Sequence, residues 1–173
     1  MKKYIILSIA ILLSICVESQ NNFKIGVYAL TGFEYELYGP PYTSYGISIE
    51  KQLNKYLGLE TGYNINNILF VDNYVKTEYS SIPINLKLYT SVLNISGGVN
   101  INFLSDISIL SEQHFSVLSL NGIYPNLIGV NISISKDISL SKSLELEPII
   151  SLKYDSKEFG PNYGIGLKLK YCL

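Results

Sequence analysis

The feature that most constrains this chain is a two-residue alternation of apolar and polar side chains that recurs along its length. In residues 93–103, Leu, Ile, Val, Phe and one Gly occupy one set of alternate positions, and Asn, Ser and Gly occupy the other. Residues 56–66 and 163–173 follow the same pattern. Successive side chains of a β-strand point to opposite faces, whereas the 3.6-residue period of a helix would scatter these sets around its circumference. The pattern therefore predicts strands with one apolar and one polar face.

Eight such segments are expected, each close to the roughly 9–11 residues that a tilted strand needs to cross a bilayer. They are residues 22–31, 45–52, 56–66, 78–89, 92–103, 126–135, 144–154 and 163–173. The connections alternate in length: 53–55 and 90–91 are tight turns and 136–143 is somewhat longer, and between them lie the long polar or Tyr-rich stretches 32–44, 67–77, 104–125 and 155–162. This alternation is typical of an even-stranded barrel with both termini on the periplasmic side. The predicted fold class is all-β, an eight-stranded antiparallel up-and-down transmembrane β-barrel.

The N-terminus predicts a secretory signal peptide. Lys2 and Lys3 precede an apolar stretch at 4–17, and cleavage is expected after Ser19. Residues 1–19 are then the leader, and residues 20–173 form the barrel domain. An uncleaved anchor helix is the alternative, but the apolar run is short for a crossing of about 20 residues. A lipoprotein signal at Cys16 is disfavoured, because Ile15 stands where such signals carry a small residue.

The polar face of the predicted strands carries charged side chains, which we expect to line the lumen. In a membrane barrel the apolar face meets lipid, and a narrow eight-stranded interior is filled by side chains. Charges in such an interior should pair with one another. The alternative is a soluble barrel that places the same charges on a solvated outer face. The expected lumen charges are Lys24, Glu50, Glu60, Lys87, Glu145, Glu147, Lys153, Lys168 and Lys170.

Two prolines fall inside predicted strands. Pro83 and Pro148 each remove one ladder hydrogen bond, so they predict local bulges or misplaced strand ends. Fifteen tyrosines accompany the strands, and their amphipathic rings suit a boundary between lipid and water.

The last residues bring a family resemblance. The segment from Gly164 to Leu173, GIGLKLKYCL, resembles the C-terminal signal by which outer-membrane barrels are recognised for insertion, although it ends in Leu rather than the usual aromatic residue. Residues 44–62, 81–89 and 93–103 resemble small barrels of the Bacteroidetes outer-membrane β-barrel group (PorT-like, "porin family"). The resemblance implies an outer-membrane location, an OmpA-like barrel and a C-terminal strand read by the barrel-insertion machinery. It carries over no catalytic or ligand-binding residue.

Little in the chain indicates chemistry. The net charge is -1 and all thirteen cationic side chains are Lys, so no basic stripe predicts a nucleic-acid partner. The single histidine, His114, has Glu112 beside it and serines at 111 and 116, but neither a metal site nor a catalytic triad is expected from sequence adjacency. Glu145 and Glu147 share a face like a carboxylate pair, yet pairing with lysines is the expected role. We therefore predict no enzyme, no catalytic, metal or cofactor-binding residue, and no cofactor.

The expected function is that of a non-enzymatic outer-membrane barrel. Its role would be structural or in surface contacts through extracellular loops, its partners would be outer-membrane lipid and the insertion machinery, and its side-chain-filled lumen would conduct little. A secreted lipocalin-like barrel holding a small apolar ligand is one alternative, although lipocalins usually carry an early Gly-x-Trp and this chain has no Trp. An accessory barrel of a secretion or membrane-assembly machine is another.

Overall fold

The computed structural model describes residues 23–34, 41–70, 75–109, 125–156 and 161–173. Within these residues, no helix has the length and hydropathy to cross a membrane. The predicted leader lies outside the described residues. The strands are β1 (Phe23–Glu34), β2 (Pro41–Gln52), β3 (Leu57–Phe70), β4 (Val75–Tyr89), β5 (Asn94–Ile109), β6 (Asn126–Ser135), β7 (Ile138–Ser139), β8 (Leu144–Asp155) and β9 (Asn162–Cys172).

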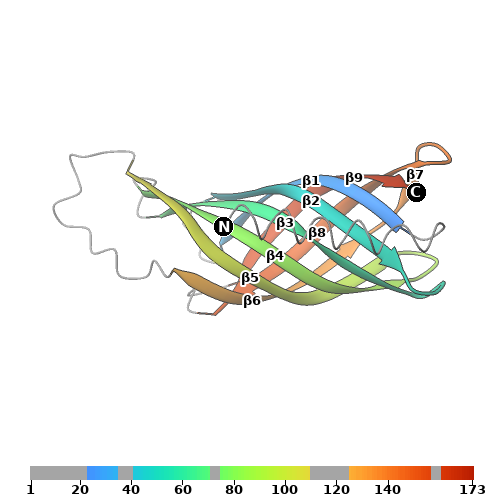
Figure 1. Cartoon of the computed structure of the whole chain (residues 1–173), viewed down its shortest axis with the longest axis horizontal. Helices are drawn as coiled ribbons and strands as arrows, with labels where there is room; N and C mark the ends of the chain where they lie inside the picture. The colour runs from blue at the N-terminus through green and yellow to red at the C-terminus, as the bar shows by residue number, and fades with distance from the viewer. Residues whose placement is uncertain (1–22, 35–40, 71–74, 110–124, 157–160) are drawn as a thin grey trace, which may run out of the picture.

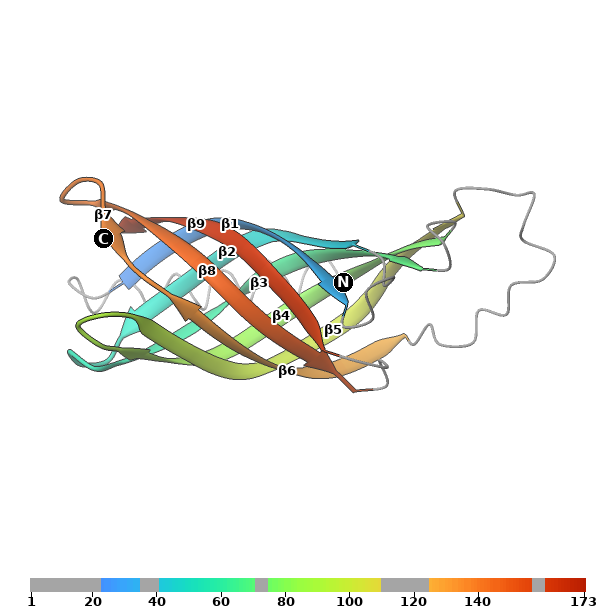
Figure 2. The same cartoon turned by 180° about the vertical axis from the view of Figure 1, so that it is seen from behind.

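The strands close into a single antiparallel barrel. The sheet runs β6-β5-β4-β3-β2-β1-β9-β8-β7, and a further pairing between β6 and β8 closes it. The two-residue β7 pairs with β8 just beyond the end of β6. It continues the position of β6 in the barrel wall and does not add a ninth strand. Figures 1 and 2 show the strands running obliquely around one long axis. The predicted eight-stranded antiparallel barrel is thus confirmed.

The predicted strand ends are wrong at the end of the barrel that carries the long connections. There β2 begins at Pro41 rather than residue 45, β3 continues to Phe70 rather than 66, and β5 continues to Ile109 rather than 103. The pair Val75–Ile109 still belongs to the β4–β5 ladder. Ladder hydrogen bonds join backbone groups, so a ladder can continue after the side-chain alternation has stopped.

Pro83 lies within β4 and marks neither a strand end nor the bulge of that strand. The β3–β4 ladder is interrupted between the pairs Thr61–Ile84 and Asn64–Ser81, beside the proline. The proline nitrogen has no hydrogen to donate to a ladder. Thr61 Oγ1 instead donates a 2.8 Å hydrogen bond to the Pro83 carbonyl.

Pro148 lies at an interruption of the barrel wall. β6 pairs with β8 as far as Ser135–Ile149, and β7 resumes at Ile138–Leu146. Pro148 of β8 therefore lies opposite a gap between the β6 and β7 ladders. No carbonyl of these two ladders needs an N–H donor at that position.

The apolar side chains face outward. Ile47, Ile132 and Leu167 are 51%, 56% and 54% exposed. Among the described residues, twenty polar or charged side chains are buried against four apolar ones. This polarity is the reverse of a water-soluble core. It does not fit the alternative in which the charges lie on a solvated outer face.

Candidate functional site

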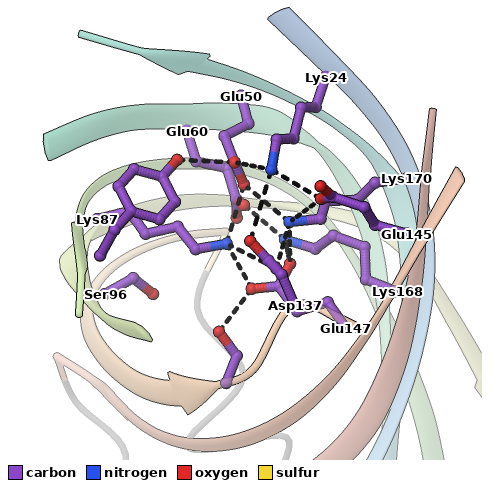
Figure 3. A network of polar contacts seen from close by, with 12 residues as sticks. Lys24, Glu50, Glu60, Lys87, Ser96, Asp137, Glu145, Glu147, Lys168 and Lys170 are labelled. Carbon is purple, nitrogen blue, oxygen red and sulfur yellow. Dashed lines mark hydrogen bonds and ion pairs between the residues drawn. The ribbon is translucent and has the colours of Figure 1, made fainter. Parts of the chain in front are cut away.

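Eight of the nine expected lumen charges meet inside the barrel (Figure 3). Together with Asp137 they form one network, here called the charged layer: Lys24, Glu50, Glu60, Lys87, Asp137, Glu145, Glu147, Lys168 and Lys170. The ninth, Lys153, lies apart and pairs with Asp155 at 2.8 Å. The side chains of the layer come from β1, β2, β3, β4, β8 and β9, so the layer connects strands across the lumen.

Lys87 lies at the centre of the charged layer. Its Nζ is 2.9 Å from Glu50 Oε2 and also contacts Glu147 Oε1. These three side chains are 1%, 1% and 2% exposed. Ser135 Oγ donates to Glu147 Oε1 at 2.5 Å, and Tyr89 OH donates to Glu50 Oε1 at 2.7 Å. Buried charges persist when they are paired and further hydrogen-bonded, and this cluster meets both conditions.

Lys168 and Lys170 contribute two more cations from alternate positions of β9. Lys168 Nζ lies 2.5 Å from Glu60 Oε2 and 3.6 Å from Glu147 Oε2. Lys170 Nζ lies 3.3 Å from Glu147 Oε2 and 3.6 Å from Glu50 Oε2. Because side chains two residues apart share a face of a strand, both lysines reach the same lumen.

Asp137 is the member of the layer that the sequence did not indicate. It lies between β6 and β7, within residues 136–143, which were predicted only as a connection between strands. Its Oδ1 accepts a 2.6 Å hydrogen bond from Lys170, and its Oδ2 lies 3.5 Å from Lys24 Nζ. Lys24 also donates to Glu145 at 2.7 Å. Pro148 was the available sequence signal for Asp137, because the barrel wall is interrupted beside this proline and the chain leaves the wall there.

The carboxylates of Glu50, Glu60 and Glu147 have oxygens within 4.8 Å of one another, a grouping that could suggest a metal centre. Ammonium groups already occupy the space around them, because three lysines of the charged layer contact these oxygens. The grouping is therefore an ion-pair network. Glu145 and Glu147 likewise pair with lysines: Glu145 with Lys24, Glu147 with Lys87, and both with Lys170, which is an arrangement of structural charges and not of a hydrolytic acid and base pair.

Polar cavities lie on both sides of the charged layer. One, of about 110 Å³, is lined by Asn85, Asn131 and other amide and hydroxyl side chains, and the layer's Lys168 lines it as well. A second, of about 250 Å³, lies beside the turn after β4 and is lined by Lys24 and Asp137. The layer thus lies between two cavities along the lumen. His114 and its neighbours lie outside the described residues.

Solved structures with a similar fold are small bacterial barrels. The Neisserial surface protein A structure superposes with a TM-score of 0.59 at 12% identity and covers 87% of this chain and 97% of that one. The outer membrane protein OprG from Pseudomonas aeruginosa gives 0.52 at 12% identity, covering 88% and 97%. Ail, the attachment invasion locus protein of Yersinia pestis, gives 0.53 at 8% identity, covering 89% and 99%.

No family model and no curated protein sequence matches the chain. At the identities of these structures, the similarity establishes the fold: a closed eight-stranded antiparallel barrel of the kind seen in outer-membrane proteins.

Proposed function

We propose that this protein is a non-enzymatic β-barrel of a bacterial outer membrane, with a structural or surface-contact role carried by its long connections. The observation that carries the proposal is the inverted polarity of the barrel, with apolar rows outside and ion pairs inside. In water the rows would expose far more contiguous apolar surface than a soluble monomer tolerates. In lipid the same rows are solvated, and closure gives the wall its backbone partners.

The outer face of β9 shows how such a wall fits a bilayer. Tyr163, Ile165, Leu167, Leu169 and Tyr171 all point outward and are 40–61% exposed. Tyr163 and Tyr171 lie at the two ends of this row, eight residues apart. This separation corresponds to about 26 Å of strand at ~3.3 Å per residue. With a tilt of about 40°, this length spans roughly 20 Å of membrane, near the apolar band of known barrels. Aromatic residues at both ends of the row fit the two interfaces.

A lipocalin-like function is disfavoured by the same polarity. A barrel that holds an apolar ligand lines its interior with apolar side chains. Here the interior is lined by amides, hydroxyls and ion pairs. The charged layer also supports low conductance, because Lys87, Glu50 and Glu147 contact one another inside the barrel and are almost fully buried.

The finer assignments are part of the proposal. The segment from Gly164 to Leu173 is proposed as the signal for the barrel-insertion machinery, which is supported by its outward apolar row on β9. Cleavage after Ser19 and membership in the PorT-like group remain predictions. A surface-contact role is supported by the similar structures of Neisserial surface protein A and of Ail, an attachment invasion locus protein.

Membrane fractionation followed by a heat-shift gel tests the proposal. The expected result is recovery with outer membranes, and faster migration in SDS of the unheated sample than of the boiled one. A protein recovered only in the soluble periplasm, with no heat-dependent shift, would overturn it. Planar-bilayer recordings test the lumen separately: we expect no large stable channel, and large stable pores would refute the closed lumen.

A further inference from the structure

We propose that the short-turn end of the barrel binds anionic phospholipid headgroups through a ring of four lysines. This inference rests on the membrane location proposed above. The lysine ring consists of Lys51, Lys55, Lys136 and Lys142. Three of them are exposed, and Lys51 is partly exposed. They lie at the end of β2, in the β2–β3 turn, just after β6, and in the turn before β8.

Two ring lysines continue the outward apolar rows. Lys51 follows Ile49 on the outer face of β2, and Lys136 follows Ile134 just beyond the end of β6, where it also lines the rim of the second cavity. Ile134 is 45% exposed. A lysine at the end of a lipid-facing row can lay its methylene stem along the apolar surface and extend its ammonium to the headgroups. Their position therefore matches the depth at which lipid phosphates lie.

Two ring lysines also lie beside aromatic rings. Lys51 Nζ is 5.0 Å from the centroid of the Phe23 ring, and Lys55 Nζ is 4.7 Å from that of Tyr56. Tyr56 is 60% exposed. Aromatic side chains favour the membrane interface, and their faces attract cations. The Lys55–Tyr56 pair therefore holds a positive charge at the boundary where headgroups begin, and Lys51 extends over the buried Phe23 ring, which is 5% exposed.

The lysine ring is not neutralised by neighbouring acids. Among the described residues, no ion pair includes a ring lysine. The two side-chain carboxylates near this end, Asp137 and Glu145, are only 19% and 16% exposed and bind Lys24 and Lys170 in the lumen. The other end differs in sign, since Glu78 faces Asp106 across the β4–β5 ladder.

The arrangement of the lysine ring favours a lipid surface over one compact anion. Lys51 and Lys55 lie by the β2–β3 turn, whereas Lys136 and Lys142 lie by the link from β6 to β8. Two strands separate these sites in either direction around the wall: β4 and β5 on one side, β9 and β1 on the other. A single small anion cannot contact both sides of a barrel, but an annulus of headgroups can.

Equilibrium unfolding in vesicles tests the proposal. The full barrel is refolded into phosphatidylcholine vesicles, with and without a fraction of phosphatidylglycerol, and unfolded in urea at low salt. A lysine near an anionic surface gains roughly fivefold in its equilibrium constant. We expect phosphatidylglycerol to lower the unfolding constant of the wild-type barrel by at least about tenfold, and high salt to remove most of this gain. The variant K51Q/K55Q/K136Q/K142Q should lose the gain and keep its stability in phosphatidylcholine.

The control is K76Q, which removes a lysine of the opposite end and should preserve the response. A wild-type barrel that folds in phosphatidylcholine but gains nothing from phosphatidylglycerol refutes the lysine ring and leaves the membrane location standing. A quadruple variant that keeps the full gain refutes it equally. Failure of the wild-type chain to fold into either kind of vesicle would refute the proposed function itself.

Discussion

Replacing Lys87 with Met should destabilise the barrel more than any other single loss of a lysine from the charged layer. Met approximates the length of the stem and removes the charge. The substitution leaves two buried carboxylates without their shortest cationic contacts, those of Glu50 and Glu147. The charged layer holds four lysines and five carboxylates, a net charge of -1 that the substitution changes to -2.

The expected loss in the free energy of unfolding follows from the contacts that Glu50 and Glu147 keep without Lys87. After the change Glu50 keeps Tyr89 OH at 2.7 Å and Lys170 at 3.6 Å, and Glu147 keeps Lys170 at 3.3 Å. The lysine contacts that remain to both carboxylates are longer than those of Lys87. Removing one partner of a buried ion pair typically costs about 3–5 kcal/mol. We expect K87M to lower the free energy of unfolding by about that amount.

A double-mutant cycle with E147Q separates the ion pair from general damage to packing. K87M/E147Q removes one charge of each sign, so the layer keeps its net charge. The double variant should therefore be more stable than the sum of the single effects by about 1–3 kcal/mol. Urea unfolding in detergent micelles, followed by circular dichroism because the chain has no Trp, measures all four proteins. K55M, which changes an exposed lysine in a turn, should stay within about 0.5 kcal/mol of wild type.

The reasoning fails if K87M unfolds within about 0.5 kcal/mol of wild type. That result would mean that water solvates Glu50 and Glu147 as well as Lys87 does, contrary to their burial at 1% and 2%. A coupling near zero in the cycle would equally show that the two charges do not act as a pair.

Three further substitutions test the wall and the layer by the same unfolding measurement. G98A should lower the free energy of unfolding by about 1–3 kcal/mol, because a Cβ at residue 98 would lie 2.0 Å from a backbone carbonyl oxygen. G97A changes the adjacent, outward-facing glycine and should be tolerated, because the nearest atom to a Cβ there is 3.6 Å away. Equal effects of the two substitutions would contradict the assigned faces. I132K should cost about 2–4 kcal/mol in vesicles, because it places a charge in the middle of the apolar band, and a neutral result would argue against lipid there. D137N should cost about 1–3 kcal/mol through its contact with Lys170, and an unchanged midpoint would show that the contact does not contribute to stability.

The sequence predicted which face each residue takes better than it predicted height along the barrel. A period of two determines whether a side chain points in or out, and it placed Lys87 and Lys168 on the inner face of their strands. It does not specify the stagger between strands, which determines the level at which inward side chains meet. Lys153 shares a face with Glu147 but lies six residues, or about 20 Å, further along β8, and the sequence did not show that the other charges meet at the level of Glu147.

Residues outside the alternating segments could not be assigned in this way. Asp137 belongs to a two-residue gap between β6 and β7, where the chain has no strand period to set a direction. An aspartate in a short connection is usually solvated, so composition gave no reason to place it in the lumen. The extensions of β3 and β5 were missed because Asn67 and Ser105 interrupt the outer apolar rows, while backbone pairing continues beyond them.

The gap beside Pro148 and the position of Asp137 explain each other. The wall loses its ladder between Ser135–Ile149 and Ile138–Leu146, so the seam that closes the barrel is weakest there. Asp137 enters the lumen from this gap and is held by Lys170 of β9 and by Lys24 of β1. These ion pairs thus connect the seam to β9 and β1, the next two strands beyond β8, where backbone hydrogen bonds are missing. The charged layer is therefore best understood as part of the closure of the barrel, and the low conductance proposed for the lumen follows from that role.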